Sequence, residues 1–352
     1  MPFWEESKLK GAITMLKIKD EGIVLEKTNL EFENKAVYNP ACIQVGDITH
    51  MFYRATGQND ISSIGYCQLK DNKVVLRFNK PIIFPEYNYE IKGVEDPRII
   101  KLEGSYYLFY SAYDGHEALV AYAKSSDLNN FQKMGVITPK FTWDEAEDLF
   151  RGAHVREEYR HYEALYKDIH GKNVLLWEKD ACLFPKKING KFAFLHRIMP
   201  GIQIVYFDDF SQLTDDFWRD YLRRLGEYIV LDPRYPFESN KIGLGCPPLE
   251  TSEGWLLITQ GVEDTQEGLV YHAGAALLDL NNPLKILGRL QEPLFSPKEE
   301  WEKIGCVKNV VFPSGTVTKQ DRIYIYYGAA DTRIGAKSML LSDLLNSLTK
   351  NP

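Results

Sequence analysis

Short β-strand patterns separated by turn residues recur along the whole chain, and they constrain its fold more than any other feature. These runs are rich in Tyr, Phe, Val and Ile, and Gly, Asp, Asn or Pro bounds them. Examples lie at 48–55, 63–68, 106–112, 118–125, 192–196, 202–207, 255–261, 271–278 and 323–329. Turns such as Asp114-Gly115 between neighbouring runs predict antiparallel hairpins. We therefore expect an all-β fold.

Three of the runs end in the same way, which is a weak internal repeat. In YYLFYSAYDG, WLLITQGVED and IYIYYGAADT, an aromatic or apolar strand ends in a small residue and an acid follows. Repetition at about the length of one blade is typical of a β-propeller. The length of 352 residues suits one closed β architecture, and no Pro/Ser-rich linker divides the chain. We expect a single domain over residues 1–352.

Two segments carry helical rather than strand periodicity. In 143–169, apolar residues recur at positions 143, 146, 150 and 153, and again at 159, 162, 166 and 169. The segment 214–225 begins with Thr214 as a capping residue and ends before Gly226, which are start and stop signals of a helix. We expect both segments to be helical insertions that decorate the strand scaffold.

The composition excludes several classes of partner. The net charge is −7 and no long run of Lys and Arg is present, so nucleic acid is not an expected partner. The five cysteines are widely spaced and form no CxxC motif, which predicts free thiols in a reducing compartment and no metal site. No stretch approaches the roughly 20 apolar residues of a membrane span, and the N-terminus lacks a signal-peptide core. We expect a cytoplasmic protein away from membranes, and a homo-oligomer is left open.

The string Gly93-Val94-Glu95-Asp96-Pro97-Arg98 gathers two carboxylates and an arginine within four residues. Arginine holds a carboxylate or a sugar hydroxyl with a rigid fork of donors, and glycoside hydrolysis requires paired acids. Aromatic residues make up 13% of the chain, and their faces suit sugar-binding clefts as well as strand packing. The string therefore predicts either a carbohydrate-active site or a common type of surface turn.

Nine strings, taken in order, resemble glycoside hydrolase family 130, the β-mannoside phosphorylases and β-mannosidases. They are YNPA at 38–41, FYRA at 52–55, GVEDPR at 93–98, YSAYDG at 110–115, KDACLFP at 179–185, LHR at 195–197, KIGLGCPP at 241–248, LLDL at 277–280 and YYGAADT at 326–332. Each string alone is weak, but the ordered set is specific and spans most of the chain. The resemblance implies a five-bladed β-propeller with a funnel-shaped site on its axis.

The resemblance also implies roles for individual residues. It implies that Asp96 is the general acid, which protonates the glycosidic oxygen through the mannosyl 3-hydroxyl in a reaction with inversion. Arg98 is expected to orient nearby carboxylates. The residues expected to hold the mannosyl unit are Asn39, Arg54, Asp114 and Asp331. The remaining candidates for substrate binding are Arg98, Lys179, Asp180, His196, Arg197 and Glu250.

The two activities of this family differ in the nucleophile. Phosphorylases need converging cationic donors for phosphate, whereas hydrolases need a carboxylate that activates water. Leu119 stands where phosphorylases typically place an arginine, and Gln260 replaces the histidine of their Tyr-His-Gly string. These departures favour an inverting β-mannosidase that acts on β-linked manno-oligosaccharides, with a β-1,2 linkage as one option. A phosphorylase with inorganic phosphate as co-substrate is the alternative, a non-catalytic carbohydrate-binding propeller is a second one, and no other cofactor is expected.

The residue that would activate water is less well defined by the sequence. Glu227, Glu250 and Glu263 are the candidates, and each could also be a solvated surface acid. Glu227 follows a predicted helix C-terminus, which is an electrostatically poor place for a carboxylate. His196 stands at a strand end beside Arg197, where a structural hydrogen bond and a ligand contact are both open.

Overall fold

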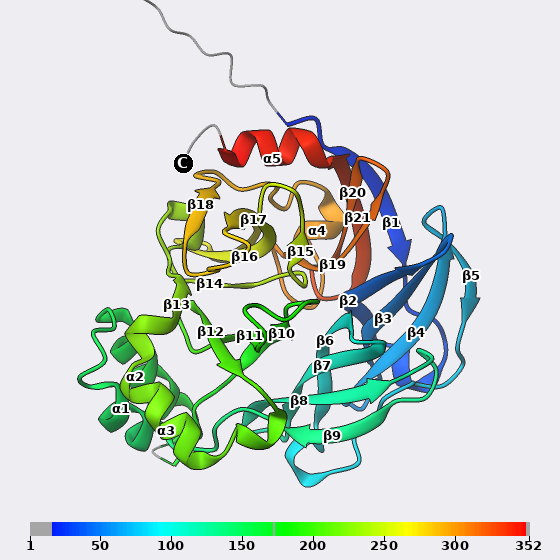
Figure 1. Ribbon diagram of the computed structural model, residues 1–352. Coiled ribbons are helices and arrows are strands. Elements are labelled where there is room, and N and C mark those ends of the chain that lie inside the picture. The colour runs from blue at the N-terminus through cyan, green and yellow to red at the C-terminus, as the bar shows by residue number, and fades with distance from the viewer. Residues whose placement is uncertain (1–15, 172, 350–352) are drawn as a thin grey trace, which may run out of the picture.

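The computed structural model describes residues 16–171 and 173–349, and β-strands dominate it (Figure 1). The largest of its sheets has eight strands, in two antiparallel halves that one parallel pair, Ser62 and Gly93, joins. The first half contains β2 (Ala36–Val45), β3 (Ile48–Thr56), β4 (Ser62–Lys70) and β5 (Lys73–Arg77). The second half contains β6 (Gly93–Leu102), β7 (Ser105–Tyr113), β8 (Ala118–Ser125) and β9 (Gln132–Val136).

Three smaller antiparallel sheets complete the strand scaffold. One contains β10 (Lys179–Leu183), β11 (Phe192–Arg197), β12 (Ile202–Phe207) and β13 (Ile229–Leu231). The next contains β14 (Lys241–Leu244), β15 (Leu249–Glu250), β16 (Trp255–Thr265), β17 (Gly268–Leu278) and β18 (Ile286–Arg289). The last contains β19 (Val311–Lys319), β20 (Arg322–Ala329), β21 (Arg333–Leu340) and β1 (Lys19–Leu25). Because β1 pairs with β21, both ends of the described chain share one sheet.

Each half of the large sheet and each smaller sheet forms one group of strands, and the first strand of each group lies innermost. These strands are β2, β6, β10, β14 and β19, and Figure 1 shows the groups arranged around a common centre. Strand β2 contacts both β19 and β6, and β10 contacts both β6 and β14. The expectation of a mostly β fold is confirmed, whereas the number of propeller blades stays a prediction.

The strand runs read from the sequence coincide with strands of the structure. Each of the nine lies within one strand, namely β3, β4, β7, β8, β11, β12, β16, β17 or β20. Asp114-Gly115 occupies the turn between β7 and β8, as expected. Apolar and aromatic residues in short runs bounded by turn residues form strands here because neighbouring strands bury them on both faces.

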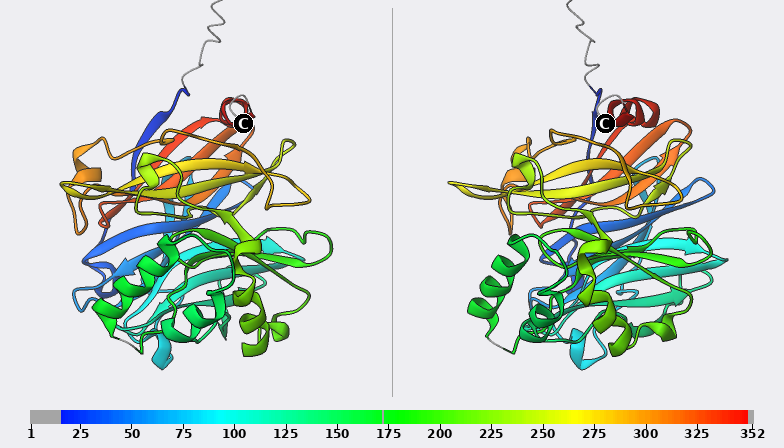
Figure 2. Two further views of the ribbon diagram at one scale, coloured as in Figure 1. Left: turned by 90° about the vertical axis from the view of Figure 1, so that its left-hand side faces the viewer. Right: turned by 60° about the vertical axis from the view of Figure 1, so that its left-hand side comes forward.

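The two predicted insertions are helical. Segment 143–169 forms two helices rather than one, α1 (Trp143–Phe150) and α2 (Glu158–His170), with a non-helical stretch between them. Segment 214–225 contains α3 (Asp215–Arg223), and Thr214 caps it by accepting a hydrogen bond from the Phe217 amide. Figure 2 shows these green helices gathered on one side of the strands. Their aromatic residues pack with β11 and β12 in one continuous core.

A buried glutamate recurs shortly before each innermost strand. The five are Glu33, Glu90, Glu178, Glu238 and Glu302, and none is more than 1% exposed. Four of them bond a side chain on the second strand of their group, and these partners are Tyr53, Tyr110, His196 and Tyr327. A buried carboxylate requires such partners, so the recurrence indicates one structural unit repeated along the chain.

Two further α-helices, α4 (Glu300–Lys303) and α5 (Leu341–Thr349), lie near the C-terminal end of the described residues. Of the helices within 16–171 and 173–349, none is both long enough and apolar enough to cross a membrane. The five cysteines form no disulfide; four are buried and Cys306 is exposed.

Candidate active site

The innermost strands carry polar residues in an unusual backbone conformation. Asn39 in β2, Asp96 in β6 and Asp180 in β10 have φ angles of 46°, 51° and 54°, and the strand register shifts at each of them. Asn and Asp tolerate the left-handed region better than most residues. Such bulges redirect a side chain and are common beside active sites. Asp331, directly after β20, has φ 50° as well.

These four residues line one cleft at the centre of the molecule. The cavity has a volume of about 240 Å³. Its walls are formed by Asn39, Arg54, Asp96, Tyr166, Trp177, Lys179, Asp180, Arg197, Met199, Lys241, Gln260, Tyr271, Val307, Val310, Phe312 and Asp331. The string at 93–98 is therefore part of a buried strand and not a surface turn. Prediction placed seven of these residues in the site.

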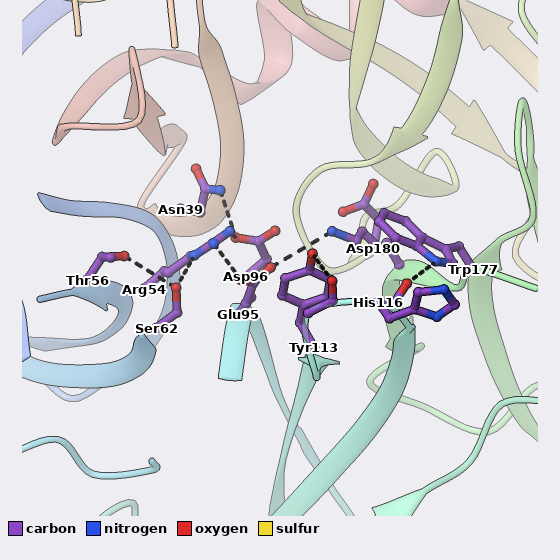
Figure 3. A network of polar contacts seen from close by, with 12 residues as sticks. Asn39, Arg54, Thr56, Ser62, Glu95, Asp96, Tyr113, His116, Trp177 and Asp180 are labelled. Atoms are coloured by element: carbon purple, nitrogen blue, oxygen red, sulfur yellow. Dashed lines mark hydrogen bonds and ion pairs between the residues drawn. The ribbon is translucent and has the colours of Figure 1, made fainter. Parts of the chain in front are cut away.

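Asp96 is held by two donors from neighbouring strands (Figure 3). Asn39 Nδ2 donates to Asp96 Oδ1 at 2.8 Å, and Arg54 Nη1 lies 3.3 Å from the same oxygen. The other terminal nitrogen of Arg54 binds Glu95 Oε1 at 2.5 Å. Burial raises the pKa of Asp96, but the charges of Arg54 and Lys179 and the Asn39 bond outweigh it and leave the pKa lowered. Asp96 is thus ionised at neutral pH.

Asp331 lies in the opposite electrostatic situation. Burial, together with the negative charges of Asp96 and Glu95, raises the pKa of Asp331 to about 6, although Arg54 acts against this shift. One cleft therefore holds two carboxyl groups whose proton affinities differ. Such divergence is typical of catalytic sites.

Arg98 lies behind the cleft and supports it. The side chain is 1% exposed, and Nη2 lies 3.0 Å from Asp180 Oδ1. Its other donors bind the backbone carbonyls of Asp96, Leu244 and Gly245. Arg98 thus orients the carboxylate of Asp180, in line with the expectation that it orients nearby carboxylates. Its bonds also fix the inner strands β6, β10 and β14 relative to one another.

Three cations line the side of the cleft formed by β10, β11 and β14. Lys179 and Arg197 were predicted, whereas Lys241 was missed. Burial, together with the nearby charge of Arg197, lowers the pKa of Lys241 to about 8. Among the described residues Lys241 forms no ion pair, although the nearby charge of Asp180 partly opposes the lowering of its pKa. Comparing the inner strands could have found it, because Lys179 and Lys241 are the first residues of β10 and β14.

Several buried polar atoms of the cleft lack a hydrogen-bond partner among the described residues. They are Asn39 Oδ1, Arg197 Nε, Arg197 Nη1 and Gln260 Oε1. Arg197 Nη1 lies 2.9 Å from Asp180 Oδ2, but the bond is not aligned. Buried polar groups are normally satisfied, so these atoms point to a polar ligand with both donors and acceptors.

Four predicted binding residues do not line the cleft, namely Arg98, Asp114, His196 and Glu250. Asp114 caps the turn after β7, where Oδ1 accepts bonds from the amides of His116 and Glu117 at 2.8 and 2.6 Å. His196 is fully buried between Glu178 and Tyr221, and it is the counterpart of the tyrosines that bind the other recurring glutamates. Its role is structural.

The three candidate bases also lie outside the cleft. Glu227 is exposed near Arg224, and Glu250 is exposed and paired with Lys186 at 2.9 Å. Glu263 bonds His272 at 3.1 Å. None of them lines the cavity, so their prediction as bases, and that of Glu250 as a binding residue, finds no support in the geometry.

The structure changes the interpretation of Leu119 and Gln260, the two positions that suggested a loss of phosphate-binding donors. Leu119 is buried in β8 and does not line the cleft. Gln260 does line it, but its amide donates to Asp180 Oδ2 at 2.8 Å. Since Lys179, Arg197 and Lys241 remain, the cleft is more cationic than the linear comparison indicated.

The raised pKa of Asp331 predicts a stability effect. Between about pH 4 and 6, the folded state binds a proton that the unfolded state releases, so stability falls as pH rises through this window. Asp331→Asn removes the buried charge and keeps a residue that tolerates φ 50°. We expect the variant to be more stable by about 3 kcal/mol at pH 8 and nearly equal to the parent near pH 4. Urea unfolding at both pH values measures this, and a gain that persists at pH 4 would contradict it.

The chain resembles proteins of known activity over nearly its whole length. A protein-family model described as Glyco_hydro_130, beta-1,4-mannooligosaccharide phosphorylase, matches residues 14–350. A 1,2-β-oligomannan phosphorylase of Thermoanaerobacter sp. is 33% identical over 342 residues, which cover 94% of this chain and 99% of the relative. A β-1,2-mannobiose phosphorylase of the same organism is 36% identical and covers 87% of this chain and 90% of the relative.

A solved structure shares the fold. It is the β-1,2-mannobiose phosphorylase from Listeria innocua in complex with β-1,2-mannobiose, with a TM-score of 0.72. The match covers 96% of this chain and 100% of that chain at 22% sequence identity. At this identity the likeness concerns the fold, and it agrees with the mostly β architecture described above.

Proposed function

Because the chain belongs to glycoside hydrolase family 130, we propose that it is a phosphorylase that uses inorganic phosphate to cleave β-1,2-linked manno-oligosaccharides. The two curated relatives described above are phosphorylases of β-1,2-linked mannosides. They favour a phosphorylase, which the sequence left as the alternative, over the hydrolase that it favoured.

The observation that carries the proposal is the convergence of Lys179, Arg197 and Lys241 on the cleft that also holds Asp96. Phosphate is strongly hydrated, and a partly enclosed site must replace that hydration with charge-assisted donors. A hydrolase would instead need a carboxylate placed to activate water. Of the cleft's three acids, Asp96 is reserved for the leaving group, and Asp180 is bound by Arg98, Arg197 and Gln260. The third, Asp331, is expected to hold the mannosyl unit, as the family resemblance implies.

The proposed reaction follows from this arrangement. A phosphate oxygen, held by the three cations, attacks the anomeric carbon of the mannosyl unit while the glycosidic C–O bond breaks. The leaving oxygen takes up the proton that Asp96 supplies through the mannosyl 3-hydroxyl, as the family resemblance implies. The product is mannose 1-phosphate with inverted configuration.

Phosphate also solves a protonation problem in the free enzyme. The charges of Arg54 and Lys179 hold the pKa of Asp96 low, which is unfavourable for a general acid. A phosphate anion bound next to Lys179 offsets positive charge near Asp96, and negative charge raises the pKa of a neighbouring carboxyl. Binding of the nucleophile would thus favour protonation of the acid.

The recurring buried glutamates support a further part of the proposal, the five-bladed propeller. One glutamate precedes each of the five innermost strands. A propeller places equivalent strand ends on one face, and this accounts for residues from β2, β6, β10 and β14 in a single cleft.

The test is a comparison of cleavage with and without inorganic phosphate. We expect β-1,2-mannobiose to yield mannose and α-mannose 1-phosphate only when phosphate is present, and β-1,4-mannobiose to react more slowly. NMR of the initial product gives its configuration. If the enzyme cleaves β-1,2-mannobiose to two mannose molecules as fast without phosphate as with it, the enzyme is a hydrolase instead.

A further inference from the structure

A second, larger cavity lies beside the cleft. Its volume is about 490 Å³, twice that of the cleft, and we call it the outer cavity. One wall comes from the inserted helix α2, with Glu158 and His161, and from Arg156 just before that helix. The opposite wall comes from the segment before β14 and includes Arg234 and Tyr235.

The outer cavity and the cleft share a common partition. In each of three pairs of neighbouring residues, one member lines the outer cavity and the other lines the cleft. The outer cavity has Tyr162, Pro200 and Asn240, and the cleft has Tyr166, Met199 and Lys241. In the partition, Tyr162 Oη donates to the Asn240 carbonyl at 2.6 Å. On α2, Tyr162 therefore lines the outer cavity, whereas Tyr166, one turn further along, lines the cleft.

The cleft is too small to hold a substrate of several mannosyl units. At about 240 Å³ it is smaller than the roughly 300–1,000 Å³ of typical small-molecule pockets. A chain of several mannosyl units must therefore continue beyond it. The outer cavity is the larger hollow that adjoins the partition, and its volume lies within that range.

The chemistry of the outer cavity suits a neutral polyhydroxylated ligand. Its positive and negative side chains are equal in number: Arg156 and Arg234 are cationic, and Glu158 and Asp264 are acidic. The guanidinium of Arg156 is already engaged by the Pro233 carbonyl and Glu158. An anion would find little unpaired positive charge here, whereas sugar hydroxyls can bond to both donors and acceptors.

Aromatic and planar polar groups add to this fit. Tyr235 is half-buried and lines the outer cavity, with the guanidinium groups of Arg234 and Arg289 each 5.5 Å from the centroid of its ring. A sugar that displaced the Arg234 guanidinium would leave the ring in contact with the apolar face of a pyranose. His161 and Arg234 are exposed and present hydrogen-bond donors from opposite walls. We propose that the outer cavity is a distal subsite that binds the mannosyl units of longer β-mannosides extending from the cleft. This inference rests on the proposed function and adds a chain-length preference to it.

The test measures binding rather than turnover, so that catalysis does not enter. In an Asp96→Asn background, calorimetric titration with β-1,2-linked chains of two and five mannosyl units gives two dissociation constants. We expect the longer chain to bind at least tenfold more tightly. Adding His161→Ala and Arg234→Ala should reduce this ratio to within about twofold while leaving binding of the disaccharide unchanged.

Arg160→Ala is the matched control, because Arg160 is an exposed cation on the same helix that does not line the outer cavity. We expect it to keep the full ratio. Equal affinity for both chain lengths, or an unchanged ratio in the double variant, would overturn the distal subsite and leave the proposed function intact. If the Asp96→Asn protein binds neither mannoside, the proposed function and the subsite both fail.

Discussion

Replacing Asp96 with asparagine is expected to lower turnover of β-1,2-mannobiose by about a hundredfold to ten-thousandfold, the usual contribution of general acid catalysis. The amide keeps the shape of the side chain but has no acidic proton to deliver. The backbone at φ 51° accepts asparagine as readily as aspartate. Initial rates at saturating phosphate, with a thermal melt to verify folding, measure the effect.

The control for this variant is Glu227→Gln, which alters an exposed acid that the sequence suggested as a base. We expect its rate to equal that of the parent. Near-parental rates in folded Asp96→Asn would remove Asp96 from the mechanism.

Replacing Lys241 with methionine is expected to raise the KM for phosphate by about 10- to 100-fold, while the affinity for the mannoside changes little. The basis is the loss of one charge-assisted hydrogen bond, worth about 1.5–3 kcal/mol. Methionine preserves the length and the apolar stem of the side chain. Steady-state kinetics with each substrate varied in turn separates the two constants.

The lowered pKa of Lys241 gives this prediction a pH signature. The ammonium is charged below about pH 8 and neutral above it. In the parent, the KM for phosphate should therefore rise as pH increases from 7 to 9. Lys241→Arg should abolish that rise, since a guanidinium stays protonated over this range. An equal pH dependence in parent and Lys241→Arg would show that Lys241 does not hold phosphate.

The strands and inserted helices could be predicted because their signals are local. Runs such as 118–125 and 202–207 match β8 and β12 at both ends, and Thr214 marks the start of α3. The break between α1 and α2 was missed, because apolar spacing continues on both sides of it. The string at 93–98 also indicated a site from the sequence alone, because three charged residues lie within four positions. In the structure they belong to an inner strand with a bulge.

The proposed phosphate nucleophile was harder to infer, because charges from different strands can substitute for one another in space. Counting from Asp114 led to Leu119 and suggested a missing cation, but Leu119 packs inside β8. The compensating charge comes from Lys241, more than a hundred residues later. A linear comparison treats each position separately, whereas a phosphate ion responds only to the summed field of the groups around it.

His196 and Arg197 show most directly where the sequence stops being sufficient. By itself, the sequence determined that both lie at the end of a strand, since the apolar run before them is local. Only the tertiary structure decided which of them faces the cleft: Arg197 lines it, and His196 turns into the core to bind Glu178. Successive side chains of a strand point to opposite faces, so just one of the two could enter the site. The choice depended on where the neighbouring sheets and α3 pack, and no pattern within the strand encodes that.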